Sequence, residues 1–229
     1  MILIRTFVTK FMEGKMKISA SILAADTAFL GKEVLELEKL GIDFIHVDAI
    51  DGHYANNFGF SPKTVKDLKR ITNLPIEVHL EILNPEDYVE IFSEAGADVI
   101  IVQFDTCKHP LRILRKIKAL GKKAGVALSP CVSFESLKWC LNDMDYLLFM
   151  SVEPGFGGQN FETFTIDKIK LAKTQLKEMG FSIPIGVDGG VNLSNVNLLK
   201  EVGVDIIVVG SALFLNEDKE KFIFQIKGG

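Results

Sequence analysis

The sequence predicts a single (β/α)8 barrel of the TIM type. Eight short apolar, β-branched runs recur along the 229 residues, and segments with helical periodicity separate them. Strands this apolar are usually buried on both faces, as in a parallel sheet covered by helices. The repeats are roughly 25–30 residues long, which suits a closed barrel of the usual size of about 250 residues.

The expected strands follow one another at regular intervals along the chain. They are Ile18–Leu23, Phe44–Asp48, Ile76–Leu80, Val99–Gln103, Ala124–Leu128, Tyr146–Met150, Ile183–Val187 and Ile206–Val209. Seven are followed by a helix, directly or after a loop, as in LGKEVLELEKL (30–40) and HPLRILRKIKAL (109–120). An eighth return helix begins in NEDKEKFIFQIK (216–227). We expect the barrel to span residues 17–229 and residues 1–16 to form an N-terminal extension.

Three junctions between helix and strand resemble one another. LGIDFIHV, AGADVIIV and VGVDIIVV each contain a Gly, an apolar residue and an Asp before an apolar strand. The Gly fits the end of a helix, where a positive φ is needed. The repetition indicates that one βα unit is used several times. A doubly wound open sheet is the alternative, but the dinucleotide motif G-x-G-x-x-G is missing after the first strand, where the chain reads SILAAD.

The composition restricts the partners of the protein. A net charge of −4 argues against nucleic acid, whose phosphate backbone calls for a basic face. A small phosphorylated ligand is still allowed, because backbone N–H groups can bind phosphate. Three cysteines without metal-type spacing favour a reducing, cytoplasmic compartment. We expect no membrane span, and the apolar N-terminal extension could serve an interface between copies of the chain in a homo-oligomer.

Polar residues stand where the expected strands end, which is the functional face of a barrel. His46 and Asp48 share a face because side chains alternate along a strand. His79 and Asp188 end two other strands at the same rim. Two imidazoles and two carboxylates converging on one mouth are typical of a divalent-metal site, and the set suits Zn²⁺, Fe²⁺, Mn²⁺ or Co²⁺.

Glycine-rich segments follow the last three strands. They are SVEPGFGGQ (151–159), VDGGV (187–191) and VGSALF (209–214). Glycines allow a ligand to approach the backbone closely and leave N–H groups free to face an anion. Loops after strands seven and eight form the usual phosphate site of such barrels, so we expect a phosphorylated small molecule as the ligand.

SILAAD, HVDAIDGHY, EVHLEILNP, AGVALSP, MSVEPGFGGQNF, VDGGVN and GSALF, in this order, resemble the ribulose-phosphate 3-epimerase family. The resemblance covers about residues 18–214. It implies an isomerase of the pentose phosphate pathway with a (β/α)8 barrel and one divalent metal, bound by His46, Asp48, His79 and Asp188. It also implies Asp48 and Asp188 as the acid–base pair. Expected substrate contacts are Ser21, His79, Gly155, Phe156, Gly157, Gly158, Gly189, Gly190, Gly210 and Ser211.

The implied reaction converts D-ribulose 5-phosphate to D-xylulose 5-phosphate. Inverting a carbon next to a ketone requires removal of a proton from one face and its return on the other, so two bases on opposite sides are a direct solution. The intermediate is an enediolate, whose charge a metal stabilises as a Lewis acid. Phosphate binding at a distance holds the reacting carbon between the two carboxylates.

The sequence departs from the family pattern at four positions. Ala20 replaces a Pro, Ile50 and Glu81 replace methionines, and Gln103 stands where a His is frequent. These departures leave other substrates open, such as D-allulose 6-phosphate. A sugar-phosphate lyase is a second alternative. Schiff-base chemistry would need a Lys at a strand end, and the sequence has none at the ends of expected strands five to seven. A non-catalytic phosphosugar-binding barrel is a third.

Overall fold

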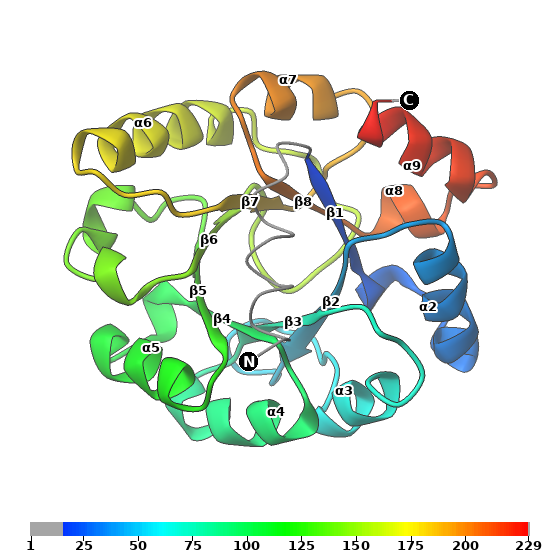
Figure 1. Ribbon diagram of the computed structural model, residues 1–229, viewed down its shortest axis with the longest axis horizontal. Coiled ribbons are helices and arrows are strands. Elements are labelled where there is room, and N and C mark those ends of the chain that lie inside the picture. Colours follow the sequence, from blue (N-terminus) through cyan, green and yellow to red (C-terminus); the bar gives the residue numbers. More distant parts are fainter. Residues whose placement is uncertain (1–15, 229) are drawn as a thin grey trace.

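A computed structural model describes residues 16–228 and confirms the predicted fold class. Eight parallel strands close into a barrel in chain order, because β1 pairs with both β2 and β8 (Figure 1). The strands are β1 (Lys17–Ser21), β2 (Phe44–Ile50), β3 (Ile76–Glu81), β4 (Val99–Gln103), β5 (Lys123–Leu128), β6 (Tyr146–Met150), β7 (Ile185–Asp188) and β8 (Ile206–Val209).

Helices surround the barrel and cover the outer faces of the strands (Figure 1). They are α2 (Leu30–Lys39), α3 (Pro62–Leu68), α4 (Val89–Ala95), α5 (Pro110–Ala119), α6 (Thr165–Glu178), α7 (Val196–Glu201), α8 (Ser211–Phe214) and α9 (Lys219–Lys227). The amphipathic pattern explains this placement, since the apolar residues of one helical face turn toward the sheet. In α5, for example, Ile113, Leu114 and Ile117 are buried.

Several strand boundaries differ from the prediction by one or two residues, and two of them have a clear local cause. β1 stops at Ser21 because the next three residues, Ile22–Ala24, turn into a short 3₁₀ helix. β7 begins at Ile185 instead of Ile183. Pro184 explains the later start, since proline has no N–H to donate to a ladder. Only its carbonyl contributes, by accepting a hydrogen bond from the backbone of Leu147.

The connection from β5 to β6 contains no α-helix, contrary to the expected pattern of helices. Two 3₁₀ turns, Phe134–Leu137 and Leu141–Asp143, cover the barrel there instead. Phe134, Leu137 and Leu141 are buried and fill the space that a helix would occupy elsewhere. A short segment therefore replaces a helix wherever enough apolar side chains reach the sheet.

The repeated Gly and Asp junctions have a clear structural role. Gly41, Gly96 and Gly203 all adopt positive φ at helix ends, as predicted. The Asp that follows each one accepts a hydrogen bond from the first residues of the preceding strand. The bonds are Ile18 N to Asp43 Oδ2 at 3.0 Å, Ile76 N to Asp98 Oδ2 at 2.8 Å and Ile185 N to Asp205 Oδ2 at 2.8 Å. Asp145 makes the same bond to Ala124 N at 3.0 Å without a preceding glycine.

The interior of the barrel changes character along its axis. At the end where the strands begin, here called its lower part, an apolar cluster contains Phe44, Val99, Ile101, Ala127, Tyr146, Leu148 and Ile206, and Met150 and Val208 continue this cluster to the pocket wall. Two residues beyond Phe44 along β2, buried polar side chains begin to replace this packing. They include His46, Asp48, His79 and Glu81, each no more than 3% exposed. The polar groups therefore gather toward the carboxyl ends of the strands.

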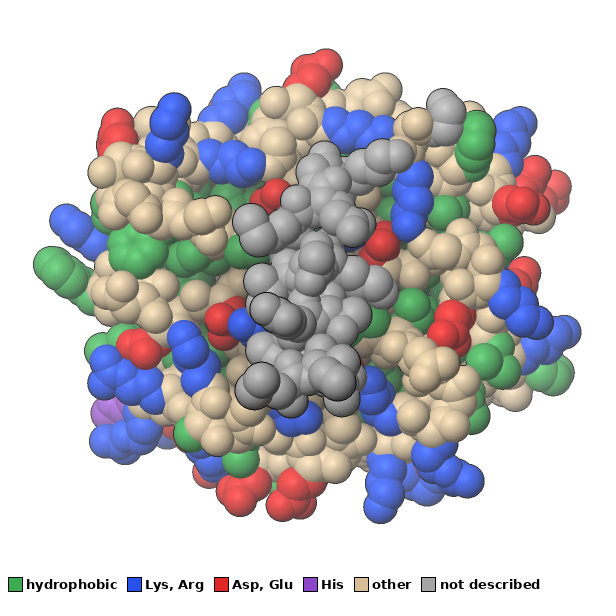
Figure 2. All heavy atoms as spheres, viewed as in Figure 1, with side chains coloured by type: hydrophobic (Ala, Val, Ile, Leu, Met, Phe, Trp, Pro, Cys, Tyr) green, Lys and Arg blue, Asp and Glu red, His purple; other side chains and the backbone are tan. Residues whose placement is uncertain are grey.

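The surface seen in Figure 2 carries Lys and Arg side chains interspersed with Asp and Glu around the edge of that face. Such mixing does not provide the continuous basic strip that a phosphate backbone calls for. Among residues 16–228, no helix has the length and apolar character that a membrane span needs.

Candidate active site

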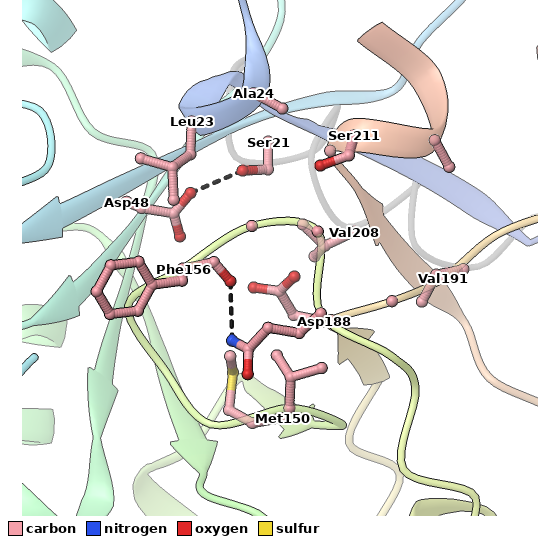
Figure 3. A pocket seen from close by; sticks show the side chains of 18 of the residues that line it. Ser21, Leu23, Ala24, Asp48, Met150, Phe156, Asp188, Val191, Val208 and Ser211 are labelled. Carbon is pink, nitrogen blue, oxygen red and sulfur yellow. Dashed lines mark hydrogen bonds between the residues drawn. The ribbon is translucent and has the colours of Figure 1, made fainter. Parts of the chain in front are cut away.

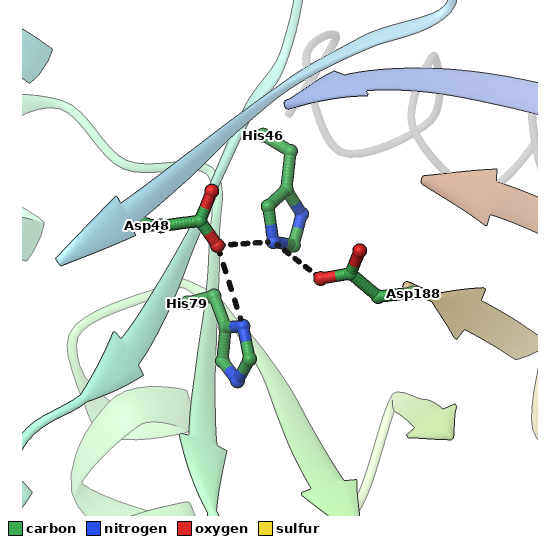
Figure 4. A group of neighbouring side chains, drawn as sticks. All are labelled: His46, Asp48, His79 and Asp188. Atoms are coloured by element: carbon green, nitrogen blue, oxygen red, sulfur yellow. Dashed lines mark ion pairs between the residues drawn. The ribbon is translucent and has the colours of Figure 1, made fainter. Parts of the chain in front are cut away.

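The barrel mouth brings together the four predicted metal ligands from three strands (Figure 4). His46 and Asp48 lie on β2, His79 on β3 and Asp188 at the end of β7. One ligand atom from each residue can be chosen so that all four lie within 4.8 Å of one another. The alternation of side chains along each strand explains why all of them point inward.

His46 lies between the two aspartates. Its Nε2 atom is 3.2 Å from Asp48 Oδ1 and 3.5 Å from Asp188 Oδ2. His79 approaches the same Asp48 oxygen, with Nδ1 at 3.6 Å. The two imidazole centroids are 5.5 Å apart, with the rings inclined by 65°. Carboxylates from β2 and β7 thus face a common centre from different sides of the barrel.

Glu77 holds His46 from behind, a role that sequence reasoning missed. Its Oε1 lies 2.8 Å from His46 Nδ1 and accepts a second hydrogen bond from Ser19 Oγ at 2.6 Å. Glu77 is completely buried. A carboxylate on Nδ1 orients the ring and leaves Nε2 available to a metal. The available signal was its position two residues before His79, on the same face of β3.

The set fits a metal ion on the structure's own geometry. His46 Nε2 and both ring nitrogens of His79 are buried without a well-formed hydrogen bond to the described residues. Buried polar atoms are costly unless something satisfies them. Two imidazoles and two carboxylates are suitable donors for a divalent transition metal. His46, Asp48, His79 and Asp188 could therefore hold one cation.

The electrostatics of the two aspartates differ sharply. Burial raises the pKa of Asp48, but His46 and His79 outweigh this effect and hold that pKa well below its usual range. Burial raises the pKa of Asp188 to about 7. Burial lowers the pKa of His46, but the charges of Asp48 and Glu77 dominate and raise it well above its ordinary value. One aspartate that stays ionised beside one that titrates near neutrality is an arrangement suited to acid–base chemistry.

A pocket of about 280 Å³ opens above these groups (Figure 3). Asp48 and Asp188 line it, and Ser21 lies beside them, donating from Oγ to Asp48 Oδ2 at 2.7 Å. All expected substrate contacts except His79 line the pocket. Besides Ser21, they are Gly155, Phe156, Gly157, Gly158, Gly189, Gly190, Gly210 and Ser211. His79 is fully buried beneath it. The volume suits a small ligand.

Glycines are required at the far side of this pocket. Gly190 has φ +59°, and a Cβ there would lie 2.5 Å from the backbone nitrogen of Phe161. Gly158 also has positive φ, 76°, but a Cβ there would meet only Ser211 Oγ at 3.9 Å. The loop after β6 is held in place by Gln159, whose Nε2 donates to the carbonyls of Glu153 and Phe156 at 2.7 and 2.9 Å. These contacts keep backbone close to the cavity.

The residues at which the sequence departs from the family pattern are all buried. Ala20, Ile50 and Gln103 are at most 6% exposed, and Glu81 is 3% exposed. The Glu81 side chain points into the barrel and not toward solvent. Its Oε1 lies 3.5 Å from His79 Nδ1, and its side chain lines the pocket. No lysine is among the described residues that line the pocket, which disfavours a Schiff-base lyase.

Comparison with known sequences identifies close relatives. The model of the Ribulose-phosphate 3 epimerase family matches residues 17–214. The ribulose-phosphate 3-epimerase of Bacillus subtilis is 41% identical over 93% of this chain and 99% of its own. That of Escherichia coli is 36% identical over 92% and 94% of the two chains. The chloroplastic ribulose-5-phosphate-3-epimerase of Arabidopsis thaliana is 39% identical over 96% of this chain and 79% of its own.

Solved structures with distant sequences share the fold. A mutant tryptophan synthase α-subunit from Pyrococcus furiosus superposes with a TM-score of 0.70 at 18% identity, covering 94% of this chain and 98% of its own. A 3-hexulose-6-phosphate synthase superposes with a TM-score of 0.65 at 14% identity, covering 93% and 98%. Identities this low support the barrel architecture alone.

Proposed function

The chain belongs to the ribulose-phosphate 3-epimerase family and is an isomerase of that type, and from this premise we propose that it interconverts D-ribulose 5-phosphate and D-xylulose 5-phosphate. The observation that carries the proposal is the convergence of His46, Asp48, His79 and Asp188, whose ligand atoms lie within 4.8 Å of one another at the floor of the pocket. The names of the relatives suggest the substrate, and the site suggests how this chain acts on it.

These four residues would hold one divalent cation, with Glu77 fixing the orientation of His46. When bound, the cation supplies Lewis-acid stabilisation of negative charge on the substrate oxygens. Coordination would also satisfy the buried imidazole nitrogens that lack a hydrogen-bond partner among the described residues. Zn²⁺, Fe²⁺, Mn²⁺ and Co²⁺ all suit two imidazoles and two carboxylates.

Asp48 and Asp188 would move the proton at C3. One carboxylate removes the proton, and the electron pair of the C3–H bond passes into an enediolate as the carbonyl at C2 becomes an enolate oxygen. The other carboxylate then returns a proton to the opposite face of C3, and the C2 carbonyl forms again. The two groups line the pocket from β2 and β7, which supports a geometry with one carboxylate on each side of a ligand held between them.

The glycine loops after β6, β7 and β8 would bind the phosphate group. Gly190 brings backbone into close packing at the pocket wall, and Ser211 adds a hydroxyl at the same end. Binding of a group that does not react orients the carbon that does, which lowers the entropic barrier to proton transfer. Charge neutralisation there would rely on N–H groups, since no lysine or arginine is among the described lining residues.

The test is incorporation of deuterium at C3 in heavy water, followed by NMR, for each epimer separately. We expect the metal-loaded protein to exchange and epimerise both. Asp188→Asn and Asp48→Asn should each reduce the rate of epimerisation by about 10³-fold or more, because an acid–base group typically contributes about 10²- to 10⁴-fold. Each variant should still exchange the proton of one epimer, and the two variants should act on opposite epimers.

Asp167→Asn serves as a matched control, because Asp167 is an exposed carboxylate on α6 that does not line the pocket. Metal content is measured in every variant, so that loss of the cation is not mistaken for loss of a base. Absence of exchange in metal-loaded wild-type protein would reject this substrate. Binding of the phosphoketose without any exchange would instead identify a non-catalytic sugar-phosphate barrel.

A further inference from the structure

One buried carboxylate in the pocket has no part in the proposed reaction. Glu81, at the end of β3, is 3% exposed and lines the cavity. Its Oε2 makes no well-formed hydrogen bond to the described residues, although the backbone of Gly155 lies nearby. A buried carboxyl oxygen without a partner is costly, and a ligand with a hydroxyl group would remove that cost.

Glu81 is not one of the four candidate metal ligands, although it contacts His79, which is one of them. The group whose ligand atoms lie within 4.8 Å of one another consists of His46, Asp48, His79 and Asp188 and does not include it. Its nearest charged contact is His79 Nδ1 at 3.5 Å, on the same strand. The free oxygen is close to the loop after β6, because a Cβ built on Gly155 would lie 4.0 Å from Oε2. Glu81 therefore borders the cavity beside the cation site instead of completing it.

The position of Glu81 in the barrel indicates which end of a ligand it meets. β3 and β7 are four strands apart in either direction around the closed sheet, so they lie opposite each other. The proposed phosphate site lies where Gly157 and Gly158 of the β6 loop approach Ser211 at the start of α8, together with the loop after β7. Gly155 of the β6 loop, in contrast, lies at the Glu81 end. A phosphoketose that spans the pocket, with its reacting carbons at the centre, would place its phosphate-free end toward β3.

We propose that Glu81 binds the C1 hydroxyl of the ketose and selects substrates that carry a hydrogen-bond donor at the end farthest from the phosphate. This inference rests on the proposed function and specifies its substrate class. A hydroxyl can donate to Oε2, the oxygen that lacks a partner. A methyl group in that place would leave the same oxygen buried and unpaired.

Gln103 is a second buried polar residue beside Glu81, on the next strand, although it does not line the pocket. β3 and β4 pair with Leu80 opposite Val102, so the next residues, Glu81 and Gln103, are neighbours across the ladder. Gln103 is fully buried, and neither atom of its amide group has a hydrogen-bond partner among the described residues. Two adjacent strands thus end in unsatisfied polar groups, whereas the lower barrel is filled with apolar packing.

The experiment compares two substrates that differ only at C1. D-xylulose 5-phosphate carries the hydroxyl, and 1-deoxy-D-xylulose 5-phosphate has a methyl group instead. The kcat/KM for deuterium exchange at C3 is measured for both, with wild-type protein, Glu81→Gln and Glu81→Met. We expect wild-type protein to prefer the hydroxylated substrate by at least about 10-fold, as expected when a buried polar group loses its partner.

The two variants separate hydrogen bonding from shape. Glu81→Gln keeps a hydrogen-bonding group of the same size and should retain most of the preference. Glu81→Met has similar length but no hydrogen-bonding oxygen and should reduce the preference to about threefold or less. A ratio between two substrates is insensitive to a general loss of activity, so a variant with fewer folded molecules still gives a usable value.

Equal rates for the two substrates in wild-type protein would overturn the inference, whatever the variants do. An undiminished preference in folded Glu81→Met would overturn it as well. Neither result touches the proposed function, which fails only if the wild-type protein does not exchange C3 of D-xylulose 5-phosphate. The proposed function is therefore tested by exchange of D-xylulose 5-phosphate, and the inference is tested by the ratio between the two substrates.

Discussion

The two sides of the barrel mouth are built from different chemistry. On the β2–β3 side, buried side chains dominate, with His46, Asp48, His79 and Glu81 each almost inaccessible to water. On the β6–β8 side, glycine loops bring backbone to the cavity, and the lining residues there include Gly158, Gly190 and Gly210. The first side supplies three of the four candidate metal ligands, to which Asp188 of β7 is added, while the backbone of the second side can bind an anion.

This difference shows how one pocket can separate reaction from binding. The charged groups on β2 and β3 are fixed by further buried partners, such as Glu77 behind His46. The glycine loops are fixed by close packing of backbone against backbone, since a Cβ at Gly190 would overlap the backbone of Phe161. Substitutions on the two sides should therefore have different kinetic signatures, with effects on metal binding and kcat on one side and on KM on the other.

The largest effect on the side-chain side, apart from loss of the aspartates, is expected from Glu77→Gln. Replacing the carboxylate weakens the hydrogen bond to His46 Nδ1 and the orientation of the ring. We expect metal affinity to fall by about 10- to 100-fold, a typical cost of losing such a partner. Competition with a chelator of known affinity measures it for Mn²⁺, Co²⁺ and Zn²⁺.

Ser19→Ala is the matched control for Glu77. It removes the hydroxyl that donates to the same Glu77 oxygen but leaves the carboxylate in contact with His46. A smaller loss of metal affinity is expected there. If Glu77→Gln bound metal as tightly as wild-type protein, the carboxylate would not be what orients His46.

On the backbone side, Gly190→Ala is expected to raise KM for the phosphoketose by about tenfold while kcat changes less. The added Cβ would meet backbone at 2.5 Å and force the loop after β7 to move. Strain of about 1–3 kcal/mol is typical of a side chain in such a left-handed conformation. Thermal unfolding and steady-state kinetics measure the two consequences.

Gly158→Ala separates clash from conformational strain. It also requires positive φ, but the added Cβ would find only Ser211 Oγ at 3.9 Å. We expect it to be the milder substitution in both stability and KM. Equal effects of the two variants would mean that backbone conformation, and not the close approach at Gly190, controls the loop.

The last prediction concerns the stability of the metal-free protein as pH changes. Burial raises the pKa of Asp188 from 3.8 to about 7, so the folded state favours the protonated form. The stability that this gives is fully present below the unfolded pKa and is lost as pH rises through about 7. The melting temperature should therefore decrease as pH rises from about 4 to about 7, and it should decrease less steeply for Asp188→Asn. Parallel curves would contradict this assignment.

The fold and the four candidate ligands could be predicted because they follow local rules. Apolar β-branched runs and period-two alternation identified the strands and the inward face that holds His46 and Asp48. Glu77 escaped prediction because a buried carboxylate on a strand looks like any other inward residue until its partner on a neighbouring strand is known. The contact of Glu81 with His79 could not be predicted for the same reason.

The connection after β5 shows a different limit of sequence reasoning. Helical periodicity was expected in every connection, but Phe134 and Leu137 cover the barrel from a single 3₁₀ turn. Burial of apolar surface depends on which side chains reach the sheet, and regular helix is only one way to deliver them. Short segments of this kind carry too few repeats for a period to be recognised.

The aspartates at the lower rim group the eight strands into four couples. Asp43 links β2 back to β1, Asp98 links β4 to β3, Asp145 links β6 to β5 and Asp205 links β8 to β7. These hydrogen bonds lie at the end of the barrel away from the pocket, so substitutions in the loops around the pocket leave them intact. The loops of such a chain can change and accept new substrates while the hydrogen bonds at the opposite end still hold the strands together.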